Sequence, residues 1–281
     1  MQQLTPRIAF TALVGSILLA ALALLPARAI AQTTTAFNDG YVVVSKMDGN
    51  GSAPGSPSVR VALEEYNPNT PAQGAPNFSV LLPTVVPNRV TISGNSTVSG
   101  GITRSVNGRY ITVPGYDVPV ATTTAGMLNT EATFRIVDGT GGVGFGTKGT
   151  FFVNGAANNR SGITDDGSNF WATGNGGGIL YAPVQPSGIP TTVSSTSTNT
   201  RAIGIFNGQL YFTTGAGSQG LYSVGTGTPT TAGQISTRVF MPLASPANAN
   251  PTQFSISPDG LTAYVVDNTS GIARYTNTAG T

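Results

Sequence analysis

Short runs of alternating apolar and polar residues, separated by turn residues, make up the chain beyond residue 31. Residues 59–64 read Val-Arg-Val-Ala-Leu-Glu, which has the period of two expected of a half-buried strand. Residues 134–138 and 209–213 form similar runs. Gly, Asn, Asp and Pro interrupt the chain every several residues, and no segment after residue 31 has apolar residues at helical spacing. The pattern predicts an all-β protein of short strands joined by turns.

A unit of strand, tight turn and aromatic strand recurs along the chain. Its copies span residues 101–110, 161–171, 201–211 and 253–264. In each copy the turn is Asn-Gly or Asp-Gly, because these dipeptides supply the positive φ angles of a tight hairpin. The turn glycines, at positions 108, 167, 208 and 260, follow one another at intervals of 59, 41 and 52 residues.

A third strand follows three of these hairpins, at residues 178–181, 220–224 and 271–275. Repeats of roughly 40 to 50 residues with several strands each are typical of propeller blades. A β-helix would repeat at a much shorter period, and a β-sandwich gives no reason for the fixed order of elements. We therefore predict a β-propeller of about five recognisable four-stranded blades, with residues 37–67 as the diverged first blade.

The end of the chain raises the question of how the predicted ring closes. Only residues 276–281 follow the third strand of the last unit, and they are too polar and few for an outer strand. Because an unpaired sheet edge invites aggregation, we expect that the chain is truncated and that C-terminal blades are missing. The alternative is that residues 41–44 complete the last blade and close the ring. Residues 191–200, rich in Ser and Thr, are expected to be a solvated connection.

The last unit resembles a known blade signature. Residues 257–260 read Ser-Pro-Asp-Gly, residues 263–268 read Ala-Tyr-Val-Val-Asp-Asn, and residues 271–272 read Gly-Ile. This sequence resembles YVTN-type propeller repeats, which are grouped with the NHL and lactonase-like propellers. The earlier copies lack the Ser-Pro pair, and the Trp-Asp dipeptide of WD40 blades is missing. More loosely, residues 37–281 are similar to exported bacterial propeller proteins with no assigned activity.

Residues 1–31 have the order of a secretory signal peptide. A polar start with Arg7 precedes an apolar run at residues 8–25, and two overlapping Ala-x-Ala sites follow in residues 27–31. The alternative is a retained membrane anchor, because 18 apolar residues reach the lower limit for spanning a bilayer. We predict cleavage before Gln32, a propeller domain at 32–281, and a secreted, periplasmic or cell-surface location. Membrane contact is expected only through an uncleaved signal segment.

Charge narrows the choice of partners. The signal segment takes Arg7 and Arg28 but no acid, so Lys and Arg fall from 13 to the number of Asp and Glu, 11. The lysines are Lys46 and Lys148, and the arginines are scattered. Without a basic cluster to displace counterions, nucleic acid is excluded as a partner. The chain has no cysteine, so packing and sheet hydrogen bonds must stabilise it without disulfides.

The chain also has no histidine, which rules out histidine-dependent catalytic triads and the usual zinc sites. Catalysis would rest on carboxylates, Tyr or Lys, with a hard cation such as calcium as the metal that oxygen ligands could hold. Residues 48–52 read Asp-Gly-Asn-Gly-Ser, like the start of a calcium loop. Ala53 stands where such a loop needs Gly, and Val59 stands where it needs Glu. A plain turn is the better prediction, and we expect no cofactor.

Residues 139–144 read Gly-Thr-Gly-Gly-Val-Gly, which satisfies the dinucleotide fingerprint Gly-x-Gly-x-x-Gly. Asp165 and Asp166 follow about twenty residues later, as that motif requires of an acidic residue. Residues 145–152 cannot form the helix that would hold the phosphate, so a glycine-rich loop is the better interpretation. Lys148 follows Thr147 and not Gly, so the P-loop pattern fails as well.

The remaining candidates are adjacent acids and aromatic residues. Glu64 and Glu65 lie on one strand and must point to opposite faces, so we expect one of them in solvent and no paired acid and base. Asp165 and Asp166 fit a hairpin turn. Trp171, Tyr110, Tyr211 and Tyr264 occupy the aromatic position of the repeat and are predicted to be core residues. We assign no catalytic residue from the sequence.

Two hypotheses for function follow. The favoured one is an exported propeller that acts as a binding or structural module at the cell envelope or outside the cell, with a protein or glycan bound at its loops. The alternative, which the resemblance implies, is a lactonase-like hydrolase that uses carboxylates and calcium in the central channel. The fold alone does not decide between them, because propellers host many functions.

Overall fold

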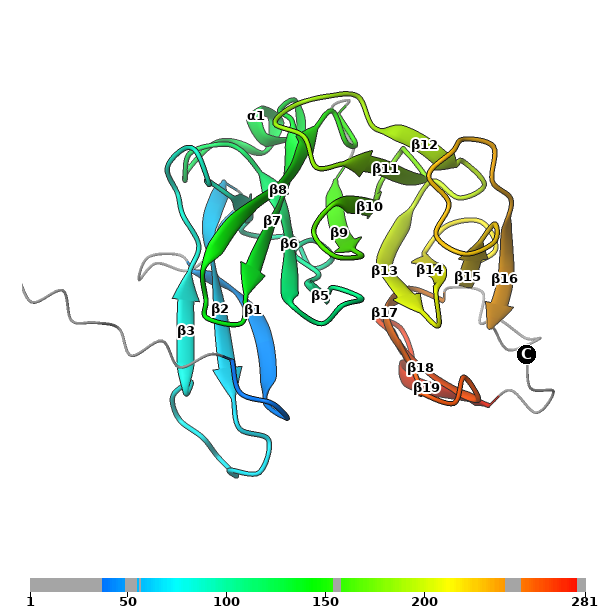
Figure 1. Ribbon diagram of the computed structural model, residues 1–281, viewed down its shortest axis with the longest axis horizontal. Coiled ribbons are helices and arrows are strands. Elements are labelled where there is room, and N and C mark those ends of the chain that lie inside the picture. The colour runs from blue at the N-terminus through cyan, green and yellow to red at the C-terminus, as the bar shows by residue number, and fades with distance from the viewer. Residues whose placement is uncertain (1–36, 49–54, 56, 154–157, 241–248, 277–281) are drawn as a thin grey trace, which may run out of the picture. The chain divides into compact units, whose positions relative to one another are not determined.

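The computed structural model describes residues 37–48, 55, 57–153, 158–240 and 249–276, in which the strands form antiparallel sheets in chain order (Figure 1). The predicted signal segment and residues 49–52 of the calcium-like turn lie outside these residues. The first sheet contains β1 (Val42–Asp48), β2 (Ser58–Tyr66), β3 (Phe78–Leu81), β4 (Thr91–Ser93), β5 (Thr103–Arg104), β6 (Tyr110–Tyr116), β7 (Ala132–Asp138) and β8 (Val143–Gly149).

Three further sheets follow along the chain. The second contains β9 (Asn159–Thr164), β10 (Asn169–Gly174), β11 (Ile179–Pro183) and β12 (Thr191–Ser194). The third contains β13 (Thr200–Phe206), β14 (Gln209–Thr214), β15 (Gly220–Val224) and β16 (Ser236–Phe240). The last contains β17 (Pro251–Ile256), β18 (Thr262–Asp267) and β19 (Gly271–Thr276).

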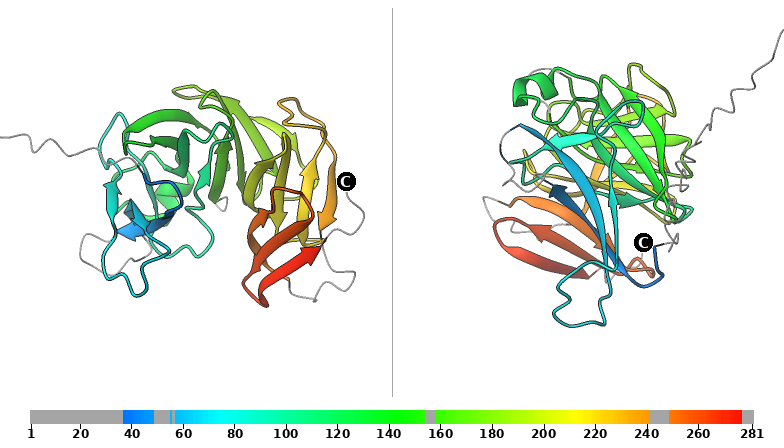
Figure 2. Two further views of the ribbon diagram at one scale, coloured as in Figure 1. Left: turned by 60° about the horizontal axis from the view of Figure 1, so that its bottom comes forward. Right: turned by 90° about the vertical axis from the view of Figure 1, so that its left-hand side faces the viewer.

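The predicted all-β propeller is confirmed. In the second, third and last sheets each strand pairs with the next one along the chain, which is the up-and-down order of a propeller blade. The eight-stranded first sheet holds one such unit, β5–β8, and a less regular one, β1–β4, in which β3 and β4 both pair with β2. The pair Thr91 and Tyr116 joins the two. Consecutive units meet through their first strands: β5 and β6 contact β9, β9 contacts β13, and β13 contacts β17. In both views of Figure 2 the last sheet lies next to the third.

The turn chemistry read from the repeat is confirmed. Gly108, Gly167, Gly208 and Gly260 have φ angles of +73°, +99°, +74° and +71°. Each glycine lies in the turn between the first two strands of its unit. At the ends of the described chain, β1 pairs with β2 and β19 pairs with β18, so residues 42–44 lie beside residues 64–66 and not beside β19.

Apolar side chains fill the spaces between consecutive units. One buried cluster joins β2, β3 and β4 to β6 and β7, a second joins β6 and β7 to β10 and β11, and a third joins β9–β12 to β13–β15. In the second cluster the contact is reciprocal. The Phe134 ring occupies the space that a side chain at Gly162 would need, and the Phe170 ring lies 2.9 Å from a Cβ built on Gly146. Glycine therefore lets two sheets approach over a buried aromatic ring.

Three local expectations are wrong, wholly or in part. Strand β2 is buried on both faces, since Val61, Leu63 and Glu65 are as inaccessible as the residues between them. Residues 191–200 are a solvated connection only in part: residues 191–194 form β12 with a fully buried Val193, and the exposed connection to β13 begins at Ser195. A short helix, α1 (Thr124–Leu128), follows β6.

Helix α1 begins where the Thr123 hydroxyl accepts a hydrogen bond from the Gly126 amide at 3.2 Å, and its Met127 and Leu128 side chains are buried. Within the part of the chain that the structure describes, no helix has the length and apolar character to cross a membrane.

Candidate functional site

The best-defined pocket among the described residues begins at the turn that precedes β1. Tyr41 donates its amide to the Asn38 carbonyl at 3.2 Å, and the Phe37 amide bonds to the Gly139 carbonyl at 2.7 Å. The Asn38 side chain donates to Glu65 at 2.9 Å, so a fully buried carboxylate of β2 anchors the turn. Asp39, the next residue, is thereby held at the edge of the first sheet.

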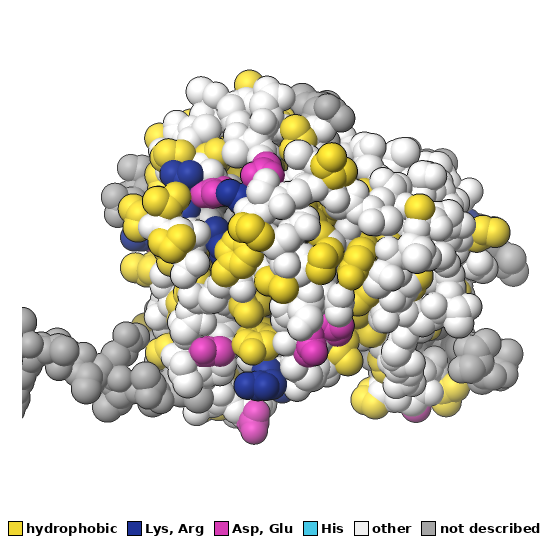
Figure 3. Space-filling model, turned by 45° about the horizontal axis from the view of Figure 1, so that its top comes forward, with side chains coloured by type: hydrophobic (Ala, Val, Ile, Leu, Met, Phe, Trp, Pro, Cys, Tyr) yellow, Lys and Arg dark blue, Asp and Glu magenta, His cyan; other side chains and the backbone are white. Residues whose placement is uncertain are grey.

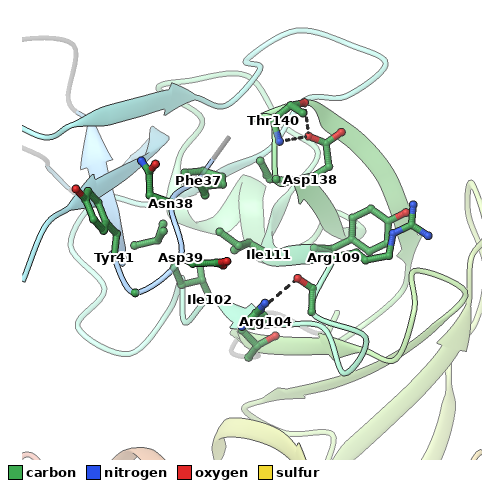
Figure 4. Close-up of a pocket in the computed structure, with 17 residues that line it drawn as sticks. Phe37, Asn38, Asp39, Tyr41, Ile102, Arg104, Arg109, Ile111, Asp138 and Thr140 are labelled. Carbon is green, nitrogen blue, oxygen red and sulfur yellow. Dashed lines mark hydrogen bonds between the residues drawn. The ribbon is translucent and has the colours of Figure 1, made fainter. Parts of the chain in front are cut away.

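The pocket lies between this turn, the β5–β6 hairpin and the β7–β8 turn, and its volume is about 790 Å³ (Figure 4). That volume lies within the range of small-molecule sites. Its floor is apolar and its rim is polar, as such sites usually are. The lining residues are Phe37, Asn38, Asp39, Gly40, Tyr41, Val43, Ile102, Thr103, Arg104, Gly108, Arg109, Tyr110, Ile111, Val137, Asp138, Gly139 and Thr140.

Asp39 and Arg104 are charged groups of the pocket with polar atoms that make no hydrogen bond among the described residues. Figure 4 shows the Asp39 side chain pointing toward the apolar floor of Ile102 and Ile111, with Arg104 beside them. No hydrogen bond or ion pair within the described residues engages the Asp39 carboxylate. The Arg104 Nε donates to the Gly108 carbonyl at 3.2 Å, which restricts the side chain, and no hydrogen bond among the described residues engages its terminal nitrogens.

The other charged residues of the rim are already engaged. The Asp138 carboxylate accepts hydrogen bonds from the Thr140 hydroxyl at 2.7 Å, the Thr140 amide at 2.8 Å and the Gly142 amide at 2.9 Å. Led by the Thr140 hydroxyl, these bonds hold the pKa of Asp138 below its ordinary value. Arg109 lies with its guanidinium carbon 5.8 Å from the centre of the Tyr110 ring. Asp138 therefore closes a turn and is not available as a base.

Carboxylates without a hydrogen-bond or ion-pair partner are rare among the described residues. Figure 3 shows one face on which acidic and basic side chains gather in small groups among hydrophobic and uncharged ones. Asp117 pairs with Arg89 at 2.9 Å and with Lys148 at 3.1 Å, and Lys148 also lies 3.6 Å from Glu131. Lys148, considered from the sequence as a P-loop lysine, is thus part of an ion-pair network. An unpaired carboxylate such as Asp39 stands out against this background.

The structure places the other sequence candidates in structural roles. Residues 139–142 form the β7–β8 turn and the strand β8 follows, so the Gly-x-Gly-x-x-Gly segment is a loop and not a dinucleotide site. Asp165 and Asp166 lie in the β9–β10 hairpin turn, where they accept bonds from Asn169 and Ser168. Both of these interpretations are confirmed.

The expectations for Glu64 and the aromatic positions need correction. Both Glu64 and Glu65 are buried, and not one of them in solvent, because Glu64 accepts hydrogen bonds from Lys46 at 2.8 Å and Tyr66 at 2.7 Å. Trp171 is a core residue as predicted, with its indole nitrogen bonded to the Pro229 carbonyl at 2.8 Å. Tyr264 is 47% exposed, because β19 and its neighbours have one face without a covering sheet among the described residues.

Tyr110 and Tyr211, the remaining residues of the aromatic position, are half-buried and not core residues. Tyr110 lines the pocket. Its ring also lies 3.2 Å from a Cβ built on Gly167 of the next unit, so one residue serves both the sheet interface and the pocket wall.

The donor set for a metal ion is poor. Over the described ranges, no three acidic side chains come together in a way that could hold a metal ion. The Asp138 oxygens are occupied by hydrogen bonds, and Asp39 is the one pocket carboxylate that remains. These residues do not fit the calcium site that the enzyme hypothesis included.

Comparison with known proteins gives matches in structure alone. No protein-family model and no curated protein sequence matches the chain. A candidate 6-phosphogluconolactonase from Bacteroides uniformis is similar with a TM-score of 0.51 and 14% identity, over 86% of this chain and 66% of that structure. The periplasmic gluconolactonase of Pseudomonas aeruginosa is similar with a TM-score of 0.50 and 16% identity, over 86% of this chain and 67% of that one. The chain thus spans about two thirds of their length.

These matches correct the favoured hypothesis for function. A binding or structural module was preferred because no catalytic residue set could be read from the sequence. Both solved structures are named as lactonases, which supports the alternative and contradicts the preferred hypothesis. At such low identity the similarity itself establishes a shared fold.

Proposed function

We propose that the protein hydrolyses a small cyclic ester, of the sugar-lactone class, in the pocket beside Asp39. One observation carries the proposal: an unpaired carboxylate and the free end of Arg104 face the same apolar-floored pocket. The similarity in fold to two structures named as lactonases supports a lactone as the substrate. The pocket itself gives a second argument. Its polar rim and apolar floor suit a compact polyhydroxylated ring.

Asp39 acts as the general base in this proposal. Its carboxylate takes a proton from a water molecule, and the water oxygen attacks the carbonyl carbon of the lactone. The ring C–O bond then breaks, and the proton passes from Asp39 to the leaving ring oxygen. The product is a hydroxy acid. No step uses a metal ion, in keeping with the poor donor set.

Arg104 stabilises the charge that develops on the carbonyl oxygen. A tetrahedral intermediate places negative charge on that oxygen, and a fixed cationic donor lowers the barrier when it is held in advance. The bond from Arg104 Nε to the Gly108 carbonyl restricts the side chain in this way. The glycine turn of the β5–β6 hairpin therefore positions a cation as well as reversing the chain.

The test compares Asp39→Asn with Asp259→Asn. Asp259 is an exposed aspartate that also precedes a glycine in a turn, between β17 and β18, and it lies outside the pocket. With glucono-δ-lactone, and spontaneous hydrolysis subtracted in a pH-stat, Asp39→Asn should lower kcat/KM by about 10² to 10⁴ and Asp259→Asn should leave it unchanged. Arg104→Met should lower kcat by about 10² to 10³. No turnover by the unmodified protein, or full turnover by Asp39→Asn, would overturn the proposal.

We also propose that the protein works outside the cytoplasm. The signal-peptide pattern of residues 1–31 supports export, and one of the structures similar in fold is a periplasmic enzyme. The YVTN-like signature of the last unit fits the same group of propellers. Cell fractionation and N-terminal sequencing test this: a mature chain that starts at Gln32 supports export, and an intact chain in the cytoplasm contradicts it.

A further inference from the structure

Four residues occupy one equivalent position in successive units. Gly101, Arg160, Arg201 and Gln253 each lie seven residues before the turn glycine of their unit, near the start of its first strand. The first strands of the units contact one another, so this position recurs where the units meet. A Cβ built on Gly101 would lie 3.0 Å from the Gln253 side-chain nitrogen, although these residues belong to sheets far apart in the chain. The equivalent positions of different units therefore lie near one another, on the first strands of the sheets.

Arg160 is buried at this position and is only partly satisfied. Its side chain is 6% exposed. One terminal nitrogen donates to the Thr200 carbonyl at 3.0 Å and to the Asn199 side chain, which ties β9 to the start of β13. The Nε atom is buried and has no hydrogen-bond partner. A buried guanidinium with an unused donor is costly unless a ligand supplies the acceptor.

Arg201 repeats the arrangement one unit later and has still fewer partners. Its Nε and Nη1 atoms are buried without hydrogen-bond partners, and no ion pair involves it among the described side chains. The guanidinium lies against Gly215, where a Cβ would be 2.6 Å from Nε. The residue as a whole is half-buried, whereas its Nε and Nη1 atoms are buried.

Neighbouring groups leave this positive charge uncompensated. Asp267 is the carboxylate that acts on Arg201, but it accepts hydrogen bonds from the amides of Asn250 at 2.6 Å, Thr269 at 2.8 Å and Ser270 at 3.0 Å. Burial, and then the charge of Arg201, lower the pKa of Arg160 to about 10. Asp267 acts on Arg201 and not on Arg160, and backbone amides already engage it.

We propose that Arg160 and Arg201 bind a small oxyanion, a carboxylate or a phosphate group, where the first strands of the second and third sheets meet. Planar guanidinium groups with free N–H donors match the paired oxygens of such anions. The amide of Gln253, which is exposed, lies at the same level and can contact the rest of the ligand. Neither arginine lines the Asp39 pocket, so this site is separate from the proposed hydrolytic one.

Arg201→Met is the informative variant, because Arg201 donates no side-chain hydrogen bond whose loss would disturb the fold. Arg274→Met is its matched control: Arg274 is an exposed arginine of β19. Sodium phosphate and sodium gluconate are titrated into each protein by calorimetry, at constant ionic strength set with chloride. Circular dichroism spectra and melting curves establish that both variants are folded.

We expect the unmodified protein and Arg274→Met to bind phosphate or gluconate equally well, and Arg201→Met to bind at least about tenfold more weakly. Comparing the two anions tells whether the site prefers phosphate or carboxylate. The proposal is overturned if neither anion binds more tightly than chloride, or if Arg201→Met retains full affinity. Loss of binding in Asp39→Asn would also overturn it, because the anion would then occupy the Asp39 pocket.

Discussion

The second and third sheets differ from the eight-stranded first sheet in what holds their strands in order. In β9–β12 and β13–β16 each strand pairs with its sequence neighbour, and a tight turn joins the first two strands of each sheet. In the first sheet, β3 and β4 both pair with β2, and residues 83–90 are inserted between them. The regular sheets thus follow from local turns, whereas the first sheet depends on side chains that reach across it.

Arg135 is the clearest of these long-range anchors. Its guanidinium, buried in β7, donates to the carbonyl of Pro87 at 2.9 Å and to that of Arg89 at 3.0 Å, across 48 and 46 residues. The Phe145 ring stacks against it, with its centre 5.0 Å from the guanidinium carbon. In the first sheet, hydrogen bonds from one buried side chain thus hold the segment between β3 and β4, where the regular sheets have a tight turn.

The largest effect is expected where the irregular sheet meets the regular ones. Phe134 is fully buried between β7 and β9, and Phe134→Ala should lower the free energy of unfolding by about 3 to 5 kcal/mol. Urea denaturation followed by tryptophan fluorescence measures it through Trp171. Val106→Ala, at an exposed turn position, should change stability by less than about 0.5 kcal/mol. A loss below about 1 kcal/mol for Phe134→Ala would show that the two regions do not depend on each other.

An intermediate effect is expected for the anchor itself. Arg135→Met should cost about 1 to 3 kcal/mol, because the carbonyls of Pro87 and Arg89 lose their donors. Arg274→Met, at an exposed strand position, serves as the control and should be nearly neutral. Hydrogen exchange should rise mainly in residues 83–90 and in β4. Faster exchange in β13–β16 instead would mean that the anchor does not act locally.

The smallest effect is expected in a regular sheet. Gly208 has a φ of +74° and open space around its Cα, so Gly208→Ala introduces backbone strain without a clash and should cost about 1 kcal/mol. Gly74→Ala, where the Cβ also meets open space but φ is not positive, should be neutral or slightly stabilising. If Gly208→Ala costs more than Arg135→Met, the comparison between the two regions is reversed.

Sequence patterns predicted the regular part of this fold because its information is local. The Asn-Gly and Asp-Gly turns and the aromatic strand after each turn lie within a dozen residues of one another. The pairing of both β3 and β4 with β2, and the helix α1, have no such local sequence pattern. The hydrogen-bond partners of Arg135 lie more than 40 residues away in the sequence, so its neighbouring residues do not indicate them. The strand at residues 191–194 was not predicted, because a single apolar residue, the buried Val193, stands among Ser and Thr residues.

The candidate sites also combine local features, which the sequence shows, with long-range contacts, which it does not. The turn around Asp39 was recognised as the start of the first unit, but the pocket combines three segments, at residues 37–43, 102–111 and 137–140. No spacing rule joins these segments. Arg160 and Arg201 share a register position that an alignment of the repeats on their turn glycines would have found. The sequence does not show that nitrogens of both arginine side chains are buried without hydrogen-bond partners.

The reciprocal packing of Phe134 and Gly162 also constrains how this sequence can evolve. A methyl group at position 162 would meet the Phe134 ring and no backbone atom, so it becomes tolerable only after position 134 has changed to a smaller residue. At Gly146 the nearest obstacle is the backbone carbonyl of Phe134, at 2.5 Å, which no substitution can remove. A substitution of Gly162 is therefore tolerated only after Phe134 has been replaced by a smaller residue, and a substitution of Gly146 is not tolerated in either case.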